Sequence, residues 1–381
     1  MTGQFQLTDD QLAIQDMARK FTADRITPFA AQWDEEHHFP RDVVQAAGEL
    51  GFGSIYVSEE SGGINLGRLE AALIMEAMAY GCPATSAYIS IHNMASWMID
   101  RFGGADVKAR YLPDLVSMEK IASYALTEPG SGSDAAALKT TARLDGDHYV
   151  INGTKQFISG SGFNDIYVVM VRTNDDKSKG ITCLVVEKGT PGLSHGAPEK
   201  KLGWNASPTA QLIFEDCRVP VANRVGGEGE GFRFAMAGLD GGRINIGACS
   251  LGGAQRCLDE AVAYTRERQQ FGQPIADFQN TQFMLADMAT ELEAARALLY
   301  LAAAKVTDNA PDKTRFSAMA KRLATDSGSK IVNDALQLFG GYGYLKDYPI
   351  ERFWRDLRVH SILEGTNQVM RMIVGRDMLR Q

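Results

Sequence analysis

Apolar residues recur at helical spacing through the first third of the chain. Thr8 followed by Gln11 has the form of a capping box. After it, Leu12, Met17 and Phe21 predict the apolar face of a first helix. The same spacing predicts further helices over residues 42–50, 68–80, 88–102 and 106–116.

The pattern changes near Lys120 to short runs rich in β-branched and aromatic residues. Asp145-Gly146 and Asn152-Gly153 have the composition of tight turns between such runs. Strands are expected at residues 148–152, 156–159, 166–173, 181–187 and 209–215. No long helices alternate with them, which disfavours a doubly wound parallel sheet. Residues 122–222 are therefore predicted to form a small all-β domain.

The helical period returns after Gly231 and persists to the end of the chain. Long helices are expected at residues 314–339 and 366–379. One apolar stripe, which we interpret as core or subunit interface rather than a cofactor contact, contains Met284, Met288, Leu292, Ala295 and Leu299. The chain is thus predicted to be mainly α with a central β domain, divided into residues 1–120, 121–230 and 231–381.

Composition excludes several classes of protein. A chain of 381 residues with 45% hydrophobic residues can bury a large core. The net charge of −8 argues against nucleic acid or an anionic membrane surface as the main partner. The five cysteines form no CxxC pair and the six histidines no HExxH, so neither a disulfide framework nor a metal site is expected. Reduced thiols fit a cytoplasmic protein. The N-terminus lacks the pattern of a secretory signal, and no apolar run is long enough to span a bilayer.

Candidate chemistry starts with Glu364, which lies between the apolar Ile362-Leu363 and the Gly365-Thr366 turn. Apolar neighbours favour burial, which raises a carboxyl pKa toward the range of a general base. A glutamate at the start of a helix is, however, usually ordinary, so Glu364 alone decides nothing.

Four further segments combine small residues with polar or charged ones. The loop 124–134 could place backbone N–H groups on a polar ligand, although such loops are more often plain turns. Two acidic residues within 226–231 make that glycine-rich segment a domain connection rather than a phosphate cradle. Arg268 could hold a diphosphate or be a surface arginine. The turn at 337–344 permits close ligand approach, but a helix C-cap would look similar.

Taken together, these segments resemble the acyl-CoA dehydrogenase flavoproteins over essentially the full length. The resemblance is carried, in this order, by YALTEPGSGSD, QFISG, RQQFG, QLFGGYGYLKDYPIER and ILEGTNQVMR. It implies a helical domain, a β-barrel-like domain and a C-terminal four-helix bundle. It also implies FAD as cofactor and Glu364 as the base that takes the α-proton while a hydride leaves the β-carbon for flavin N5.

The resemblance assigns further residues. FAD contacts are implied for Tyr124, Leu126, Thr127, Ser133, Phe157, Ser159, Arg268, Phe278, Gln279, Gln337, Gly341, Thr366 and Gln368. Many relatives carry Trp in place of Phe157. The segment from Arg268 to Gln279 is expected to reach the FAD of a neighbouring subunit in a homotetramer. Contacts to the acyl-CoA are implied for Ser133, Asp240, Arg243, Gly365 and Arg376.

The substrate subgroup is suggested by GWNASPT, FEDCRVPVANRVG, LDGGRINIGACSLG and GGYGYLKDY, and by Leu363 before the base. These segments look closest to the family members that act on isobutyryl-CoA in valine breakdown and pass electrons to an electron-transferring flavoprotein. Alternatives are a dehydrogenase for 2-methylbutyryl- or butyryl-CoA, an acyl-CoA oxidase, and a flavin-bearing member that binds nucleic acid or a partner and performs little catalysis. The acidic composition disfavours the last.

Overall fold

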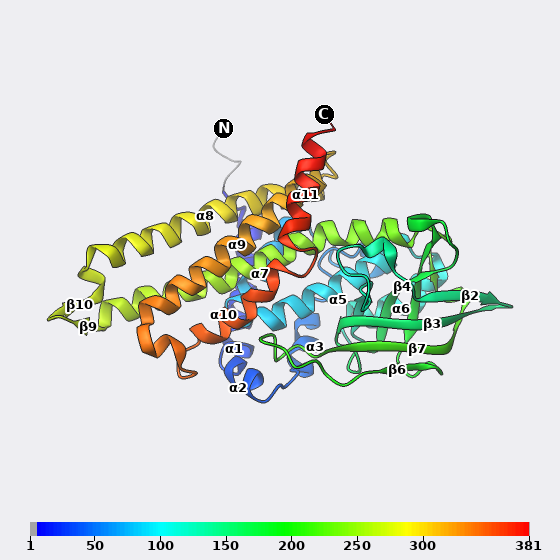
Figure 1. Cartoon of the computed structure of the whole chain (residues 1–381), viewed down its shortest axis with the longest axis horizontal. Coiled ribbons are helices and arrows are strands. Elements are labelled where there is room, and N and C mark those ends of the chain that lie inside the picture. Colours follow the sequence, from blue (N-terminus) through cyan, green and yellow to red (C-terminus); the bar gives the residue numbers. More distant parts are fainter. Residues whose placement is uncertain (1–5, 381) are drawn as a thin grey trace.

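The computed structural model describes residues 6–380, and the first five residues of the predicted non-secretory N-terminus lie outside that range. Helices form the first third of the described chain, as predicted (Figure 1). They are α1 (Asp9–Arg25), α2 (Ala30–Glu35), α3 (Arg41–Glu49), α4 (Arg68–Ala79), α5 (Pro83–Phe102) and α6 (Ala105–Val116).

The start of α1 confirms one prediction and corrects another. The Thr8 hydroxyl accepts a hydrogen bond from the Gln11 backbone N–H, and the Gln11 side chain accepts one from the Thr8 N–H, which completes the capping box. The predicted apolar face is confirmed at Phe21 and wrong at Leu12 and Met17, which are 49% and 37% exposed. The buried face of α1, which packs against α4, contains Gln15, Ala18 and Thr22 together with Phe21.

The middle of the chain forms one mixed sheet in the order β6-β7-β3-β2-β4-β5-β8, and β1 pairs with β4. The strands are β1 (Ala122–Ala125), β2 (Thr141–Asp145), β3 (His148–Ser159), β4 (Ile166–Arg172), β5 (Ile181–Glu187), β6 (Leu193–His195), β7 (Thr209–Pro220) and β8 (Arg224–Val225). Only short 3₁₀ turns interrupt them, so the predicted absence of a doubly wound sheet is confirmed.

The two predicted tight turns have different outcomes. Asp145-Gly146 joins β2 to β3, with Gly146 in the left-handed region at φ +63°. Asn152-Gly153 is not a turn, because both residues lie inside β3. The pairing of β3 with β7 shifts between Ile151 and Gly153, where Glu215 and Asp216 of β7 lie opposite the single residue Asn152, so the β-bulge is in β7.

The last third is again helical, with α7 (Gly231–Glu267), α8 (Gln279–Thr307), α9 (Lys313–Phe339), α10 (Ile350–Arg358) and α11 (Asn367–Met378). The predicted α8 stripe is confirmed as core at four positions, Met288, Leu292, Ala295 and Leu299, and Met284 is half-buried. The short β9 (Gln269–Gln270) and β10 (Gln273–Pro274) form a hairpin between α7 and α8.

The two helical parts share one hydrophobic core, which contains Ile74 and Ile89 from α4 and α5 together with Leu251, Leu299 and Leu357 from α7, α8 and α10. Helix α7 runs nearly the length of the molecule through this core (Figure 1). It therefore offers a continuous rigid surface on which the β domain and the C-terminal segment can both place side chains. In the described part of the chain, no helix is long and apolar enough to cross a membrane.

Candidate active site

Glu364 lies in the turn between α10 and α11, with backbone φ values of +56° for Glu364 and +90° for Gly365. A left-handed conformation is rare for a residue with a side chain, and it aims Glu364 at α7. The side chain is half-buried, but Oε2 is out of solvent contact and has no hydrogen-bond partner among residues 6–380. A Cβ at Gly242 of α7 would lie 2.6 Å from Oε2, so only glycine admits the carboxylate here.

The surroundings of Glu364 raise its pKa from 4.5 to about 7. Burial is the main cause, and the nearby charges of Arg243 and Lys321 offset part of it. A carboxyl with a pKa near 7 exchanges its proton readily at neutral pH, which is the property that general-base catalysis requires.

Asp240 and Arg243, both on α7, lie beside the turn that carries Glu364. Arg243 Nη1 lies 2.9 Å from Asp240 Oδ1, and Arg243 Nε donates to the Glu364 carbonyl oxygen at 3.3 Å. The Thr314 hydroxyl donates to the other Asp240 oxygen at 2.6 Å. Both ions are buried, so this pair is a fixed polar wall beside Glu364.

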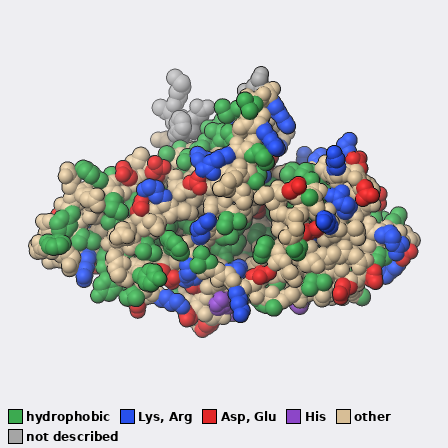
Figure 2. Space-filling model, in the orientation of Figure 1, with side chains coloured by type: hydrophobic (Ala, Val, Ile, Leu, Met, Phe, Trp, Pro, Cys, Tyr) green, Lys and Arg blue, Asp and Glu red, His purple; other side chains and the backbone are tan. Residues whose placement is uncertain are grey.

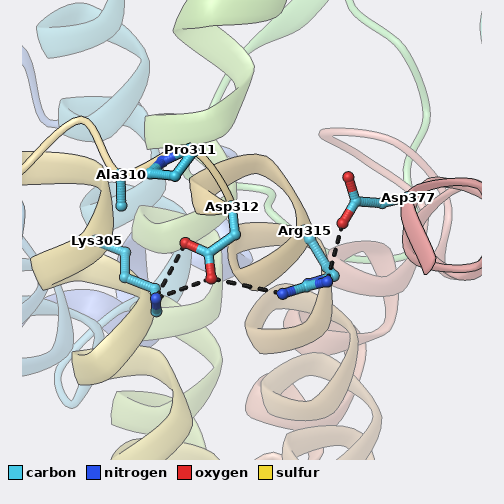
Figure 3. A pocket seen from close by; sticks show the side chains of 6 residues that line it. All are labelled: Lys305, Ala310, Pro311, Asp312, Arg315 and Asp377. Carbon is cyan, nitrogen blue, oxygen red and sulfur yellow. Dashed lines mark hydrogen bonds and ion pairs between the residues drawn. The ribbon is translucent and has the colours of Figure 1, made fainter. Parts of the chain in front are cut away.

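A charged pocket of about 420 Å³ lies beside the start of α9, where α8, α9 and α11 meet (Figure 3). Asp312 bridges Lys305 and Arg315, and Arg315 also pairs with Asp377 at 3.1 Å. The predicted substrate residue Arg376 is the exposed neighbour of Asp377 and makes no hydrogen bond with the described residues. Its role stays a prediction.

Two β-domain segments predicted to contact flavin lie side by side, because the Gln156 backbone N–H donates to the Thr127 carbonyl at 2.8 Å. A buried ion pair fixes this arrangement. Lys155 Nζ donates to the Leu126 carbonyl at 3.1 Å and to the Glu128 carboxylate at 2.8 Å. Glu128 also accepts the N–H groups of Lys139 and Thr140.

Phe157 is presented to solvent by a bulge in β3. The pairing with β7 shifts between Lys155 and Ile158, and Phe157 has φ +59° and is 63% exposed. An exposed aromatic ring on a rigid strand beside Thr127 fits a planar ligand. Ser133 is exposed on the adjoining loop, and Ser159 is half-buried at the end of β3.

Tyr124, in β1, lies close enough to Glu364 for the carboxylate charge to act on its hydroxyl. Its hydroxyl is buried without a partner among the described residues. Burial, with the neighbouring Glu364 charge, raises the pKa of Tyr124 well above its usual range. The predicted base thus lies against the β domain. Thr366 caps α11 by accepting the Val369 N–H at 3.3 Å, and Gln368 is exposed on the same turn.

A second group of predicted cofactor residues lies far from Glu364. Arg268, Gln337 and Gly341 line one pocket of about 640 Å³ at the end of the bundle that carries β9 and β10 (Figure 1). A Cβ at Gly341 would meet nothing within 4 Å, so the surface is open there. Phe278 and Gln279 begin α8 beside it. The structure therefore does not bring this group together with Phe157 within one chain.

Comparison with known proteins identifies the family to which this chain belongs. Family models match three segments: the N-terminal domain of acyl-CoA dehydrogenase over residues 8–119, the middle domain over 123–217 and the C-terminal domain over 229–379. This chain belongs to the acyl-CoA dehydrogenase family. It is an oxidoreductase by that membership.

Individual members of the acyl-CoA dehydrogenase family match over nearly the whole chain. Isobutyryl-CoA dehydrogenase, mitochondrial, of Dictyostelium discoideum is 57% identical, with 98% of this chain and 90% of the relative covered. The protein of the same name from Bos taurus is 52% identical, with the same coverage. Among solved structures, butyryl-CoA dehydrogenase from Megasphaera elsdenii matches with a TM-score of 0.96 at 37% identity, over 99% of this chain and all of that one.

The structure of this acyl-CoA dehydrogenase also brings forward residues that the sequence did not indicate. Lys321 lies in α9 among Ala318, Ala320 and Ala324, all fully buried. A lysine within a stripe of small residues was the available signal. Lys155 and Gly242 gave none, since their partners are remote in sequence.

Proposed function

We propose that this acyl-CoA dehydrogenase converts a short branched acyl-CoA, isobutyryl-CoA, to methacrylyl-CoA in valine catabolism, with Glu364 as the base. The observation that carries the chemistry is the Glu364 carboxylate, whose Oε2 is excluded from solvent and has no partner among the described residues. The acyl group is suggested by the names of the two relatives at 57% and 52% identity.

The residues around Glu364 suit removal of a weakly acidic α-proton. The Glu364 carboxylate accepts this proton, and its raised pKa makes the transfer more favourable than for an exposed glutamate. The Glu364 backbone N–H makes no hydrogen bond with the described residues and is free to donate to the thioester carbonyl. A preorganised donor of this kind contributes about 3–4 kcal/mol in other enzymes. When bound, FAD supplies the acceptor for the hydride that leaves the β-carbon.

Both parts of the predicted FAD site fit a dinucleotide. Thr127, Ser133 and Phe157 offer a polar edge and an aromatic face, and Arg268 with Gln337 offers charge-assisted donors for a pyrophosphate. Because the two parts do not meet within one copy of the chain, one FAD would contact two copies. We therefore propose a homotetramer, the usual assembly in the family, with an electron-transferring flavoprotein as the acceptor of electrons.

Exposed apolar side chains at the bundle end support that assembly. Phe271 and Tyr344 are 95% and 83% exposed there, and Figure 2 shows hydrophobic side chains over this end of the molecule. The five cysteines are free and buried, which supports a reducing compartment such as the cytoplasm. The two relatives are named as mitochondrial.

Anaerobic mixing of the holoenzyme with isobutyryl-, 2-methylbutyryl-, isovaleryl-, butyryl- and octanoyl-CoA tests the proposal. We expect the flavin to be bleached fastest by isobutyryl-CoA. Glu364→Gln should retain FAD and abolish bleaching. Turnover that survives this substitution would assign the base elsewhere, and faster bleaching by another thioester would replace the substrate. Peroxide formation in air at the rate of turnover would identify an oxidase instead.

A further inference from the structure

Lys321 is a charged residue in the core whose role the proposed chemistry leaves open. It lies in α9 and is 0% exposed. No carboxylate oxygen among residues 6–380 lies within 4.0 Å of its ammonium group, so it has no direct ion-pair partner there. Burying an ammonium group without such a partner is costly, which suggests that the fold retains the charge for a purpose.

The ammonium group of Lys321 instead holds the turn that carries Glu364. It donates to the Gly365 carbonyl oxygen at 2.9 Å and to Asn367 Oδ1 at 3.0 Å. The Asn367 amide in turn donates to Asp326 Oδ1 at 2.6 Å. These contacts tie α9 to the residues immediately after Glu364. The left-handed backbone conformation of Gly365 sets the direction in which its carbonyl points.

We propose that Lys321 is a positioning residue that holds Glu364 in its reactive orientation and favours the ionised form of its carboxyl group. The proposal rests on Glu364 being the base. Lys321 acts on Glu364 through its hydrogen bonds to the turn and through its positive charge, and it does not contact the Glu364 carboxylate.

The charges around Lys321 determine the sign of its effect. It faces Glu364 on the turn, Arg243 on α7, Asp326 on its own helix and His360 before the turn. Burial lowers the pKa of Lys321 to about 8, and the Glu364 charge raises it in part. Lys321 is therefore still mainly protonated at pH 7 and lowers the pKa of Glu364. His360 is buried, and its pKa is lowered to about 3, so it stays neutral and does not compete.

The test compares Lys321→Met with the wild-type holoenzyme and with Lys330→Met. Lys330 is a lysine on the exposed face of the same helix, and its one ion-pair partner among residues 6–380 is Asp334, so it controls for net charge. The pH dependence of anaerobic flavin reduction by isobutyryl-CoA gives one readout. A second readout needs no turnover: the pH dependence of the infrared C=O stretch of protonated Glu364, which is identified as the band that Glu364→Gln lacks.

We expect Lys321→Met to move both midpoints up by about one pH unit, the size of effect that an adjacent opposite charge has. Lys330→Met should move neither. Lys321→Gln, which keeps a donor without the charge, should reproduce the shift if the methionine variant does not fold, and Lys321→Arg should restore the wild-type midpoint. Unchanged midpoints in a folded Lys321→Met or Lys321→Gln protein would overturn the proposal. Flavin reduction by Glu364→Gln would instead overturn the assignment of the base.

Discussion

Gly242→Ala should slow flavin reduction by roughly 100-fold without damaging the fold. Gly242 lies inside α7, where the Glu364 carboxylate approaches the helix backbone. A Cβ added there would lie 2.6 Å from Oε2 and 2.9 Å from Cδ of Glu364. The obstructed atoms are the far end of a flexible side chain, so the carboxylate will swing aside rather than push the helices apart.

The displacement can be estimated from these distances. A normal contact requires about 3.4 Å, so the carboxylate must move by about 0.8 Å. Misplacement of a catalytic group by about 1 Å costs roughly 100-fold in rate. Replacing glycine by alanine inside a helix favours folding by roughly 0.5–1 kcal/mol, so the variant should be at least as stable as wild type.

Stopped-flow reduction of the bound flavin by isobutyryl-CoA measures the rate, and thermal unfolding measures the stability. The matched control is Gly375→Ala in α11, where no atom lies within 4 Å of the new Cβ. It should leave the rate constant unchanged. A Gly242→Ala enzyme that reduces its flavin at the wild-type rate would refute the argument that this glycine positions the base.

Two further predictions concern stability. Lys155→Met leaves Glu128 buried without its cation, so we expect the free energy of unfolding in urea to fall by about 3–5 kcal/mol. The double variant Lys155→Met/Glu128→Leu should recover part of this loss. Equal urea midpoints for wild type and Lys155→Met would contradict the prediction. Glu364 has a native pKa of about 7, above its usual 4.5, so the native state holds the proton more tightly and wild-type stability falls as pH rises through this interval. Glu364→Gln cannot ionise and should therefore exceed wild type in unfolding free energy at pH 8 and lose that advantage near pH 4.5, whereas a difference that is constant with pH would exclude a buried titrating carboxyl.

The order of helical, β and helical segments was predictable because apolar residues recur at helical spacing over long stretches of the sequence. Local signals also located the capping box at Thr8 and the hairpin at Gly146. Asn152-Gly153 misled, since only the pairing with β7 shows that these residues lie inside a strand, opposite a bulge in its neighbour. Leu12 and Met17 misled because α1 buries Gln15, Ala18 and Thr22 beside Phe21 and leaves the two apolar residues exposed.

Glu364 and its motif could be predicted, but the support beneath it could not. Lys321 reaches groups 44 and 46 residues away in sequence, and a lysine in a helix ordinarily indicates a solvated face. Gly242 acquires its meaning only when the Glu364 turn folds back onto α7. Sequence patterns report what a residue is next to along the chain, whereas these residues act on remote neighbours.

The core shared by the first and last helices has a consequence for biosynthesis. The apolar faces of α4 and α5 pack on α7, yet 114 residues separate the end of α6 from the start of α7. At about 5–20 residues per second, a ribosome needs on the order of 10 s to make them. During that interval the finished N-terminal helices present Ile74 and Ile89 without their partners. A nascent chain of this protein should therefore depend on ribosome-associated chaperones, and a chain truncated before α7 should aggregate rather than fold as a smaller domain.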